Sequence, residues 1–360
     1  DADRAPSAAR HALAQWGAIA WVALVAVWLD HPEIAVGVIF STSVAALSLH
    51  LGVAVASIPQ ARRAGHGFDI VLDPSGDARS GASASLPGNR ITPSRAWAFV
   101  LPTAVLTLVV GFSGKLTLIH ALVLALEGVL VATVWQQAGQ GIPPEASRRL
   151  STERKLQLAL AVVLGAVGAV AAVYGAVRMS AETKIMSTGL IASAALGPLL
   201  ILPMIGSASV LASHGHAQTA VGASVMIVFL NLCLLLPVAV TVWHVRQMFV
   251  VPPVVEAVTP TTKSTTTAPM APTTTTTTTQ AIDDESFVDE EAAFSVDDMP
   301  KVFTFPIATW RIDTVLLILL GLMILPVALN LWEIRRSEGL LLIVVYACYL
   351  VATTFLGRRW

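Results

Sequence analysis

His31 to Val55 reads HPEIAVGVIFSTSVAALSLHLGVAV, and His216 to Val240 reads HAQTAVGASVMIVFLNLCLLLPVAV. The second stretch aligns on the first without a gap, 185 positions later. Matches of Leu on Leu are expected in any apolar sequence, but the shared His…Ala-Val-Gly opening is more specific. Such a repeat is typical of membrane proteins built from two related halves. The identical positions of the first copy are His31, Ala35, Val36, Gly37, Leu47, Leu49, Leu51, Val53, Ala54 and Val55.

The composition predicts an all-α integral membrane protein. Hydrophobic residues make up 55% of the chain and charged residues 12%, whereas a soluble domain carries about 25% charged residues. The apolar residues form blocks of about 20, the length of a membrane-spanning helix, and they lack the alternation of a membrane barrel. We expect nine spans, at 11–30, 33–57, 96–113, 116–137, 156–178, 185–212, 217–245, 307–330 and 339–356.

Several other classes of protein find no support in the sequence. The net charge is −1 and no basic stripe is present, so a nucleic-acid partner is not expected. Cys233 and Cys348 both lie in apolar blocks, where we expect packing residues rather than a disulfide framework. The sequence has no nucleophile elbow, phosphate-binding loop or zinc motif, so we expect no enzyme activity, resident metal or cofactor.

Loop charges predict the orientation in the membrane. Thirteen Lys and Arg lie in the N-terminus and in 58–95, 138–155, 213–216 and 331–338, against nine on the other side. By the positive-inside rule, loops 58–95 and 138–155 are cytoplasmic, and the insert 248–305 and the C-terminus are extracytoplasmic. We expect the membrane to be a bacterial plasma membrane.

The insert 248–305 contains a threonine tract followed by an acidic run. Because it lacks apolar periodicity, it cannot bury a core, and we expect it to be disordered. Two interpretations remain open, an O-glycosylated stalk and a flexible solvated linker.

The two copies of the repeat lie on the second and seventh predicted spans. Since these are an odd number of spans apart, the copies cross the membrane in opposite directions, which defines an inverted repeat. We therefore predict a first half at 1–137, a cytoplasmic linker at 138–155 and a second half at 156–356.

The last two spans resemble a known family. Their motifs are similar to the R-x-D, I-S-R-x-E-G and Y-x-x-Y-L patterns of prokaryotic sodium/calcium antiporters in the cation/calcium exchanger superfamily. In this chain the motifs occupy Arg311–Asp313, Ile334–Gly339 and Tyr346–Tyr349. The family's second alpha repeat is matched at Pro203, Gly215, Ala217, Ala220, Gly222 and Asn231.

This resemblance implies ten spans in two inverted halves, with degenerate alpha repeats here at 11–57 and 185–245. The nine predicted spans are one short of that number. The start at Asp1, without an initiator Met, is explained either by a further span upstream or by removal of a signal peptide.

The resemblance also implies a mid-membrane cation site between the alpha repeats, with one glutamate from each. This chain has Ile19 and Met204 at those two positions. Ca²⁺ takes six to eight oxygen ligands, usually including carboxylates, so the loss of both acids argues against Ca²⁺.

What remains in the spans is a set of neutral oxygen donors and one acid. These side chains are either ligands for a monovalent cation or small polar solute, or they bond to their own helix and let helices pack closely. His50 is expected to be a hydrogen-bonded packing residue near a span end. The candidate residues of the ion path are Ser41, Thr42, Ser43, Glu127, Ser207, Ser209, Ser224 and Asn231.

These features predict a secondary-active cation transporter that works by alternating access, with the lipid bilayer and a small inorganic cation as partners. The alternative is a non-transporting member of the same fold that acts as a membrane scaffold or sensor. The ion, the stoichiometry and the oligomeric state stay open.

Overall fold

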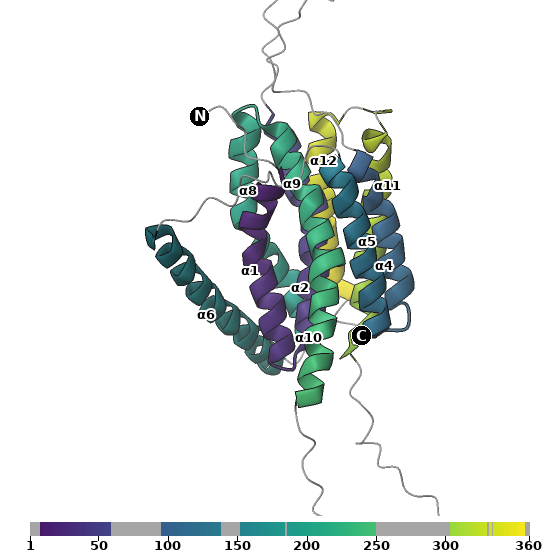
Figure 1. The fold of residues 1–360 in the computed structure, drawn as a ribbon. Coiled ribbons are helices and arrows are strands. Elements are labelled where there is room, and N and C mark those ends of the chain that lie inside the picture. The colour runs from purple at the N-terminus through teal and green to yellow at the C-terminus, as the bar shows by residue number, and fades with distance from the viewer. Residues whose placement is uncertain are drawn as a thin grey trace, which may run out of the picture. The chain divides into compact units, whose positions relative to one another are not determined.

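The computed structural model describes residues 8–58, 95–137, 152–183, 186–249, 303–329, 331–332 and 334–356 (Figure 1). Segments η1 (Ala46–His50), η4 (Ala192–Leu196) and η5 (Leu230–Leu235) are π-helical, and η2 (Arg95–Phe99) is a 3-10 helix. Strands β1 (Lys115–Leu116) and β2 (Phe303–Thr304) pair antiparallel. The helical elements are α1 (Ala8–Trp28), α2 (Pro32–Ala45), η1 (Ala46–His50), α3 (Leu51–Ala56), η2 (Arg95–Phe99), α4 (Val100–Gly111), α5 (Leu118–Gln137), α6 (Thr152–Thr183), α7 (Thr188–Ile191), η4 (Ala192–Leu196), α8 (Gly197–Ser213), α9 (Ala217–Phe229), η5 (Leu230–Leu235), α10 (Leu236–Phe249), α11 (Ile307–Ala328) and α12 (Arg336–Leu356).

The chain forms two units, one of residues 1–246 with 302–360 and one of residues 247–301. The predicted loops 58–95 and 138–155 and the insert 248–305 lie largely outside the described residues. At its edges the insert differs from the prediction, because α10 continues to Phe249 and β2 occupies Phe303–Thr304.

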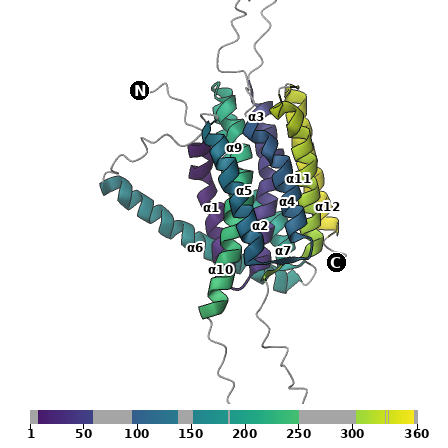
Figure 2. The same ribbon diagram turned by 45° about the vertical axis from the view of Figure 1, so that its right-hand side comes forward.

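Eight of the nine predicted spans are helices long and apolar enough to cross a membrane. The segment predicted at 96–113 is a shorter apolar helix, Trp97–Gly111, formed by η2 and α4. Helix α6 is longer than the predicted span and leans away from the other helices at one end (Figure 2). The all-α prediction is confirmed, while the total of nine spans stays a prediction.

The two copies of the repeat fold into the same order of elements, α2–η1–α3 and α9–η5–α10. With the 185-residue offset, α2 and α9 start at equivalent positions, and so do α3 and α10. The two π-helices between them end at equivalent positions as well. A π-helix is a rare interruption of the α-helical hydrogen-bond pattern, so its recurrence at the same place is a specific similarity of backbone structure.

The similarity includes the turn before each copy. Asp30 and Gly215 hold equivalent positions and both have positive φ, 72° and 85°. The next amides, of His31 and His216, donate to carbonyls five residues earlier at 2.9 and 2.8 Å. These features define a Schellman cap at the end of α1 and of α8. Asp tolerates the left-handed conformation better than most residues with a side chain.

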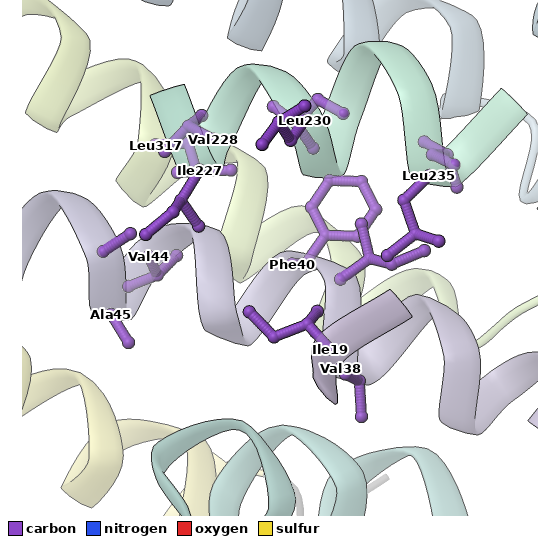
Figure 3. Close-up of a cluster of buried hydrophobic side chains, with 14 of the residues drawn as sticks. Ile19, Val38, Phe40, Val44, Ala45, Ile227, Val228, Leu230, Leu235 and Leu317 are labelled. Atoms are coloured by element: carbon purple, nitrogen blue, oxygen red, sulfur yellow. The ribbon is translucent and has the colours of Figure 1, made fainter. Parts of the chain in front are cut away.

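The two copies run antiparallel through the core. In Figure 2, α2 continues upward into α3, whereas α9 continues downward into α10. Accordingly, α3 packs against α9, and η5 packs against α2. Figure 3 shows the apolar side chains at this contact, among them Phe40, Val44, Ile227 and Leu230.

Burial separates the central helices from the peripheral ones. In the most apolar 18-residue window of Pro32–Ala56, 94% is buried inside the protein. In the corresponding window of Ala159–Thr183, only 17% is buried. Apolar side chains that other helices do not cover must face lipid in a membrane protein. The repeat therefore forms the interior, and α6 lies at the periphery.

Candidate functional site

The consecutive hydroxyls of Ser41, Thr42 and Ser43 are all fully buried on α2. Thr42 Oγ1 and Ser43 Oγ donate to carbonyls one turn earlier, at 2.6 and 2.7 Å. Ser41 faces Gly197 of α8, where a Cβ would overlap the serine hydroxyl. Gly197 thus allows α8 to approach α2 closely at Ser41, while the hydroxyls of Thr42 and Ser43 keep their acceptor lone pairs for a second partner.

That partner is Asn231 of η5. Its Nδ2 donates to Thr42 Oγ1 at 2.9 Å and to Ser43 Oγ at 3.1 Å. Its Oδ1 accepts a hydrogen bond from Trp16 Nε1 of α1 at 2.9 Å. The fully buried amide is therefore satisfied at both ends by protein groups. We call Trp16, Thr42, Ser43 and Asn231 the amide cluster.

A second polar cluster lies among α1, α8, η1 and α9. His50 Nδ1 is 2.5 Å from Ser224 Oγ. Gln15 Nε2 donates to Ser207 Oγ, which donates in turn to the carbonyl of Met204 at 2.7 Å. His11 Nε2 lies 2.9 Å from Gln15 Nε2 and interacts electrostatically with His50. The Met204 cluster, as we name it, comprises His11, Gln15, His50, Met204, Ser207 and Ser224.

Two polar atoms of this cluster are buried without a hydrogen-bond partner among the described residues, Nε2 of His50 and Oε1 of Gln15. Ser224 Oγ also lies 3.2 Å from the carbonyl of Ala220. Either Ser224 Oγ or His50 Nδ1 donates the 2.5 Å contact between them, depending on the tautomer of the imidazole. The backbone of Met204 is a further neighbour of the His50 ring.

The Met204 cluster includes one of the two positions at which the sequence resemblance implies a glutamate and this chain has another residue. The structure gathers imidazole, amide and hydroxyl groups around Met204.

The remaining candidates lie apart from both clusters. Ser209 Oγ is 3.0 Å from Ser57 Oγ of the turn after α3. Glu127 of α5 accepts a hydrogen bond from Thr103 Oγ1 of α4 at 2.7 Å, and its Oε2 is buried without a partner among the described residues. Gly128, next to it, contacts Cys233 of η5 closely. Glu127 therefore lies beside η5 without a bond to the amide cluster.

Two residues of the Met204 cluster, His11 and Gln15, were not identified from the sequence. His50 is hydrogen-bonded, as expected, and is fully buried in η1. The spacing of four between His11 and Gln15 places them on one face of a helix, which was the signal available in the sequence.

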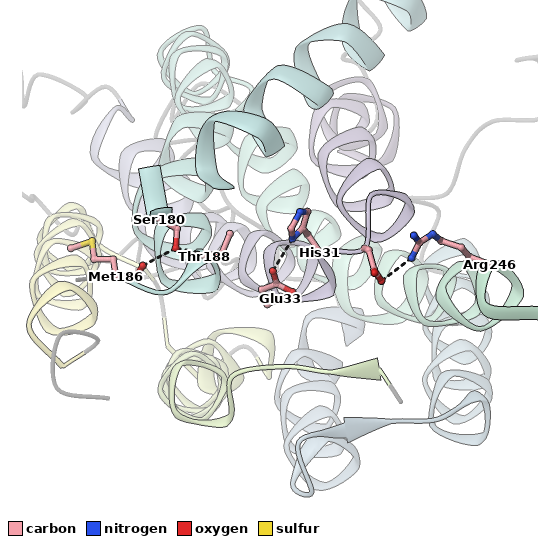
Figure 4. Close-up of polar contacts among 7 residues, drawn as sticks. His31, Glu33, Ser180, Met186, Thr188 and Arg246 are labelled. Carbon is pink, nitrogen blue, oxygen red and sulfur yellow. Dashed lines mark hydrogen bonds and ion pairs between the residues drawn. The ribbon is translucent and has the colours of Figure 1, made fainter. Parts of the chain in front are cut away.

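Polar contacts form around the α1–α2 turn at one end of the bundle (Figure 4). His31 Nδ1 lies 3.2 Å from Glu33 Oε1, and Arg246 Nη1 of α10 lies 2.8 Å from Asp30 Oδ1. All four side chains are partly exposed, so each pair adds little stability. Glu33, an acid of the first repeat, is thus at a helix start and outside both clusters.

Eight long apolar helices with a buried central repeat define the chain as an all-α membrane protein. Within the described ranges, no group of three or more His, Cys, Asp or Glu side chains could hold a metal ion. No protein-family model matches the chain, and no characterised protein matches its sequence.

Proposed function

We propose that this protein is a secondary-active transporter of protons or another small monovalent cation, with an inverted-repeat fold like that of cation/calcium exchangers. The observation that carries the proposal is the antiparallel pair of α2–η1–α3 and α9–η5–α10, broken at equivalent points by π-helices. Interrupted helices from two inverted halves are the usual frame of a mid-membrane substrate site.

The Met204 cluster is the substrate site in this proposal. It lies between helices of both halves and contains two buried polar atoms, His50 Nε2 and Gln15 Oε1, that have no hydrogen-bond partner in the described part of the chain. It holds imidazole, amide and hydroxyl groups and no carboxylate, which suits a proton or monovalent cation better than a divalent one. A buried polar atom without a partner is energetically costly and is kept where a water, an ion or a ligand completes it. Rocking of one half against the other would open the cluster to each side in turn.

The direct test is ion flux in liposomes that contain the purified full chain, with imposed gradients of Na⁺, K⁺, H⁺ or Ca²⁺. We expect flux with a monovalent gradient and none with Ca²⁺. His50→Ala removes the open ring nitrogen and should abolish most of the flux. His214→Ala is the matched control, because His214 is exposed in the α8–α9 turn. Flat traces for all four ions would reject the proposal.

A membrane scaffold or sensor is the second candidate. It is favoured by the amide cluster, where protein groups occupy both ends of Asn231. It is also favoured by the absence of any acid from 186–245, the described part of the second alpha repeat. Flat traces combined with a normally folded protein would support this alternative.

We further propose a bacterial plasma membrane, with loops 58–95 and 138–155 in the cytoplasm. A protease site introduced into 58–95 should be cut in inverted membrane vesicles and protected in intact cells. The reverse pattern would show that the orientation is wrong.

A further inference from the structure

Helices α11 and α12 follow one another in the chain but make few direct contacts. Helix α11 packs against α4 and α2, whereas α12 packs against α3 and η1. A hydrogen bond crosses between them, from Tyr349 OH to Asp313 Oδ1 at 2.7 Å. Beside this bond, a groove of about 570 Å³ remains between the two helices.

The groove is apolar and opens on the surface that faces lipid. Val315 and Leu319 of α11 and Val344 of α12 are 48%, 56% and 56% exposed. Such exposed aliphatic side chains on membrane-spanning helices contact acyl chains. The walls are formed mainly by Ile312, Val315, Leu316, Leu319, Val344 and Val345.

The groove carries a positive charge at one end. Arg311 is the charged member of its lining, and it is exposed, with its guanidinium 5.3 Å from the centre of the Phe112 ring. Neither ion pair found in the described part of the chain involves Arg311. Arg311 lies one turn after the start of α11, so its guanidinium can reach the membrane surface.

An apolar groove with an arginine side chain at its membrane-surface end has the chemistry of a lipid-binding site. Its volume falls in the range of ordinary ligand pockets, about 300–1,000 Å³. Arginine binds phosphate through a planar fork of donors and is attracted to anionic head groups.

We propose that the groove between α11 and α12 binds one acyl chain of an anionic phospholipid, with the lipid phosphate on the guanidinium of Arg311. The bound chain fills the space that the two helices leave open and covers Tyr349, which lines the groove and holds buried Asp313. This lipid site does not depend on whether the protein transports an ion.

The test uses the full chain in nanodiscs of phosphatidylcholine with a small fraction of phosphatidylglycerol that carries a photoreactive diazirine on its acyl chain. After illumination, labelled peptides are mapped by mass spectrometry. We expect labels to concentrate in 312–319 and 344–352. Arg311→Gln should lower this labelling about fivefold, the effect of one lost contact between arginine and an anionic head group.

Arg178→Gln is the matched control, since Arg178 of α6 also stacks on an aromatic ring, Tyr174, at 5.7 Å. It should leave the labelling unchanged. Cys348→Phe places a ring in the groove and should block labelling with Arg311 intact.

Three results would overturn the proposal. The first is equal labelling by a diazirine phosphatidylcholine, which shows no selection for the anionic head group. The second is full labelling of the Arg311→Gln protein. The third is labelling that disappears as the ratio of protein to lipid rises, because a second copy then occupies the groove.

Discussion

Asn231→Ala is expected to destabilise the fold through the loss of hydrogen bonds, three of which are made to other side chains. The amide bonds to Trp16, Thr42 and Ser43 at 2.9, 2.9 and 3.1 Å. Hydrogen bonds between membrane helices contribute about 0.6 kcal/mol each. The lost bonds therefore amount to roughly 2 kcal/mol, and the cavity left by the side chain adds to this cost.

A double-mutant cycle with Trp16→Phe isolates one of these bonds. Thr42 and Ser43 keep their own backbone acceptors in Asn231→Ala, whereas the Trp16 indole N–H loses its partner. In the Trp16→Phe background that N–H no longer exists. We expect a coupling energy of about 0.6–1.7 kcal/mol between the two positions.

The assay is reversible unfolding of the four proteins in mixed micelles by increasing SDS, followed by tryptophan fluorescence. Since Trp16→Phe changes the signal, circular dichroism serves as the second probe. Coupling within about 0.3 kcal/mol of zero, the usual range for independent sites, would show that the amide cluster does not stabilise the fold as described.

Three further substitutions test the packing by the same unfolding assay. Gly37→Ala should lower the free energy of unfolding by about 1–3 kcal/mol, because its Cβ would lie 2.7 Å from a backbone oxygen of the facing helix. The control Gly206→Ala should be neutral, since its Cβ would meet nothing within 4 Å. Equal effects of the two substitutions would contradict the close approach. Tyr349→Phe leaves buried Asp313 without its hydrogen-bond donor and should lower the free energy of unfolding by about 1–3 kcal/mol. Tyr346→Phe removes a buried hydroxyl that has no partner in the described residues and should not destabilise the fold. A larger loss of stability for Tyr346→Phe than for Tyr349→Phe would contradict the hydrogen bond to Asp313. Gly215→Ala places a side chain at φ 85° and should cost about 1–2 kcal/mol; an unchanged stability would show that the Schellman cap is not formed there.

The spans were predictable because the bilayer acts on local sequence. A block of about 20 apolar residues satisfies its backbone only as a helix in lipid, and eight of the nine predicted blocks are such helices. The block at 96–113 shows the limit of this reasoning. Its hydropathy does not reveal that η2 turns as a 3-10 helix before α4 begins at Val100.

The candidate site was predictable only in part. Thr42, Ser43 and Asn231 were identified from the sequence, and the structure brings them together in the amide cluster. Ser207 and Ser224 also belong to one cluster, but their contacts with His11, Gln15 and His50 were not anticipated. Each contact joins residues more than 150 positions apart, and a hydropathy pattern holds no information about which helix faces match.

The sequence by itself determined the helical class, most of the spans and the repeat. The ungapped alignment of His31–Val55 on His216–Val240 identified the repeat, while the π-helices that interrupt both copies at equivalent points were revealed only by the structure. The tertiary structure decided which buried polar groups meet. Asn231 bonds to Thr42 and Ser43, whereas Glu127 bonds to Thr103 of α4 and not to the amide cluster. Such contacts depend on how separate helices pack, and that packing is a property of the whole bundle.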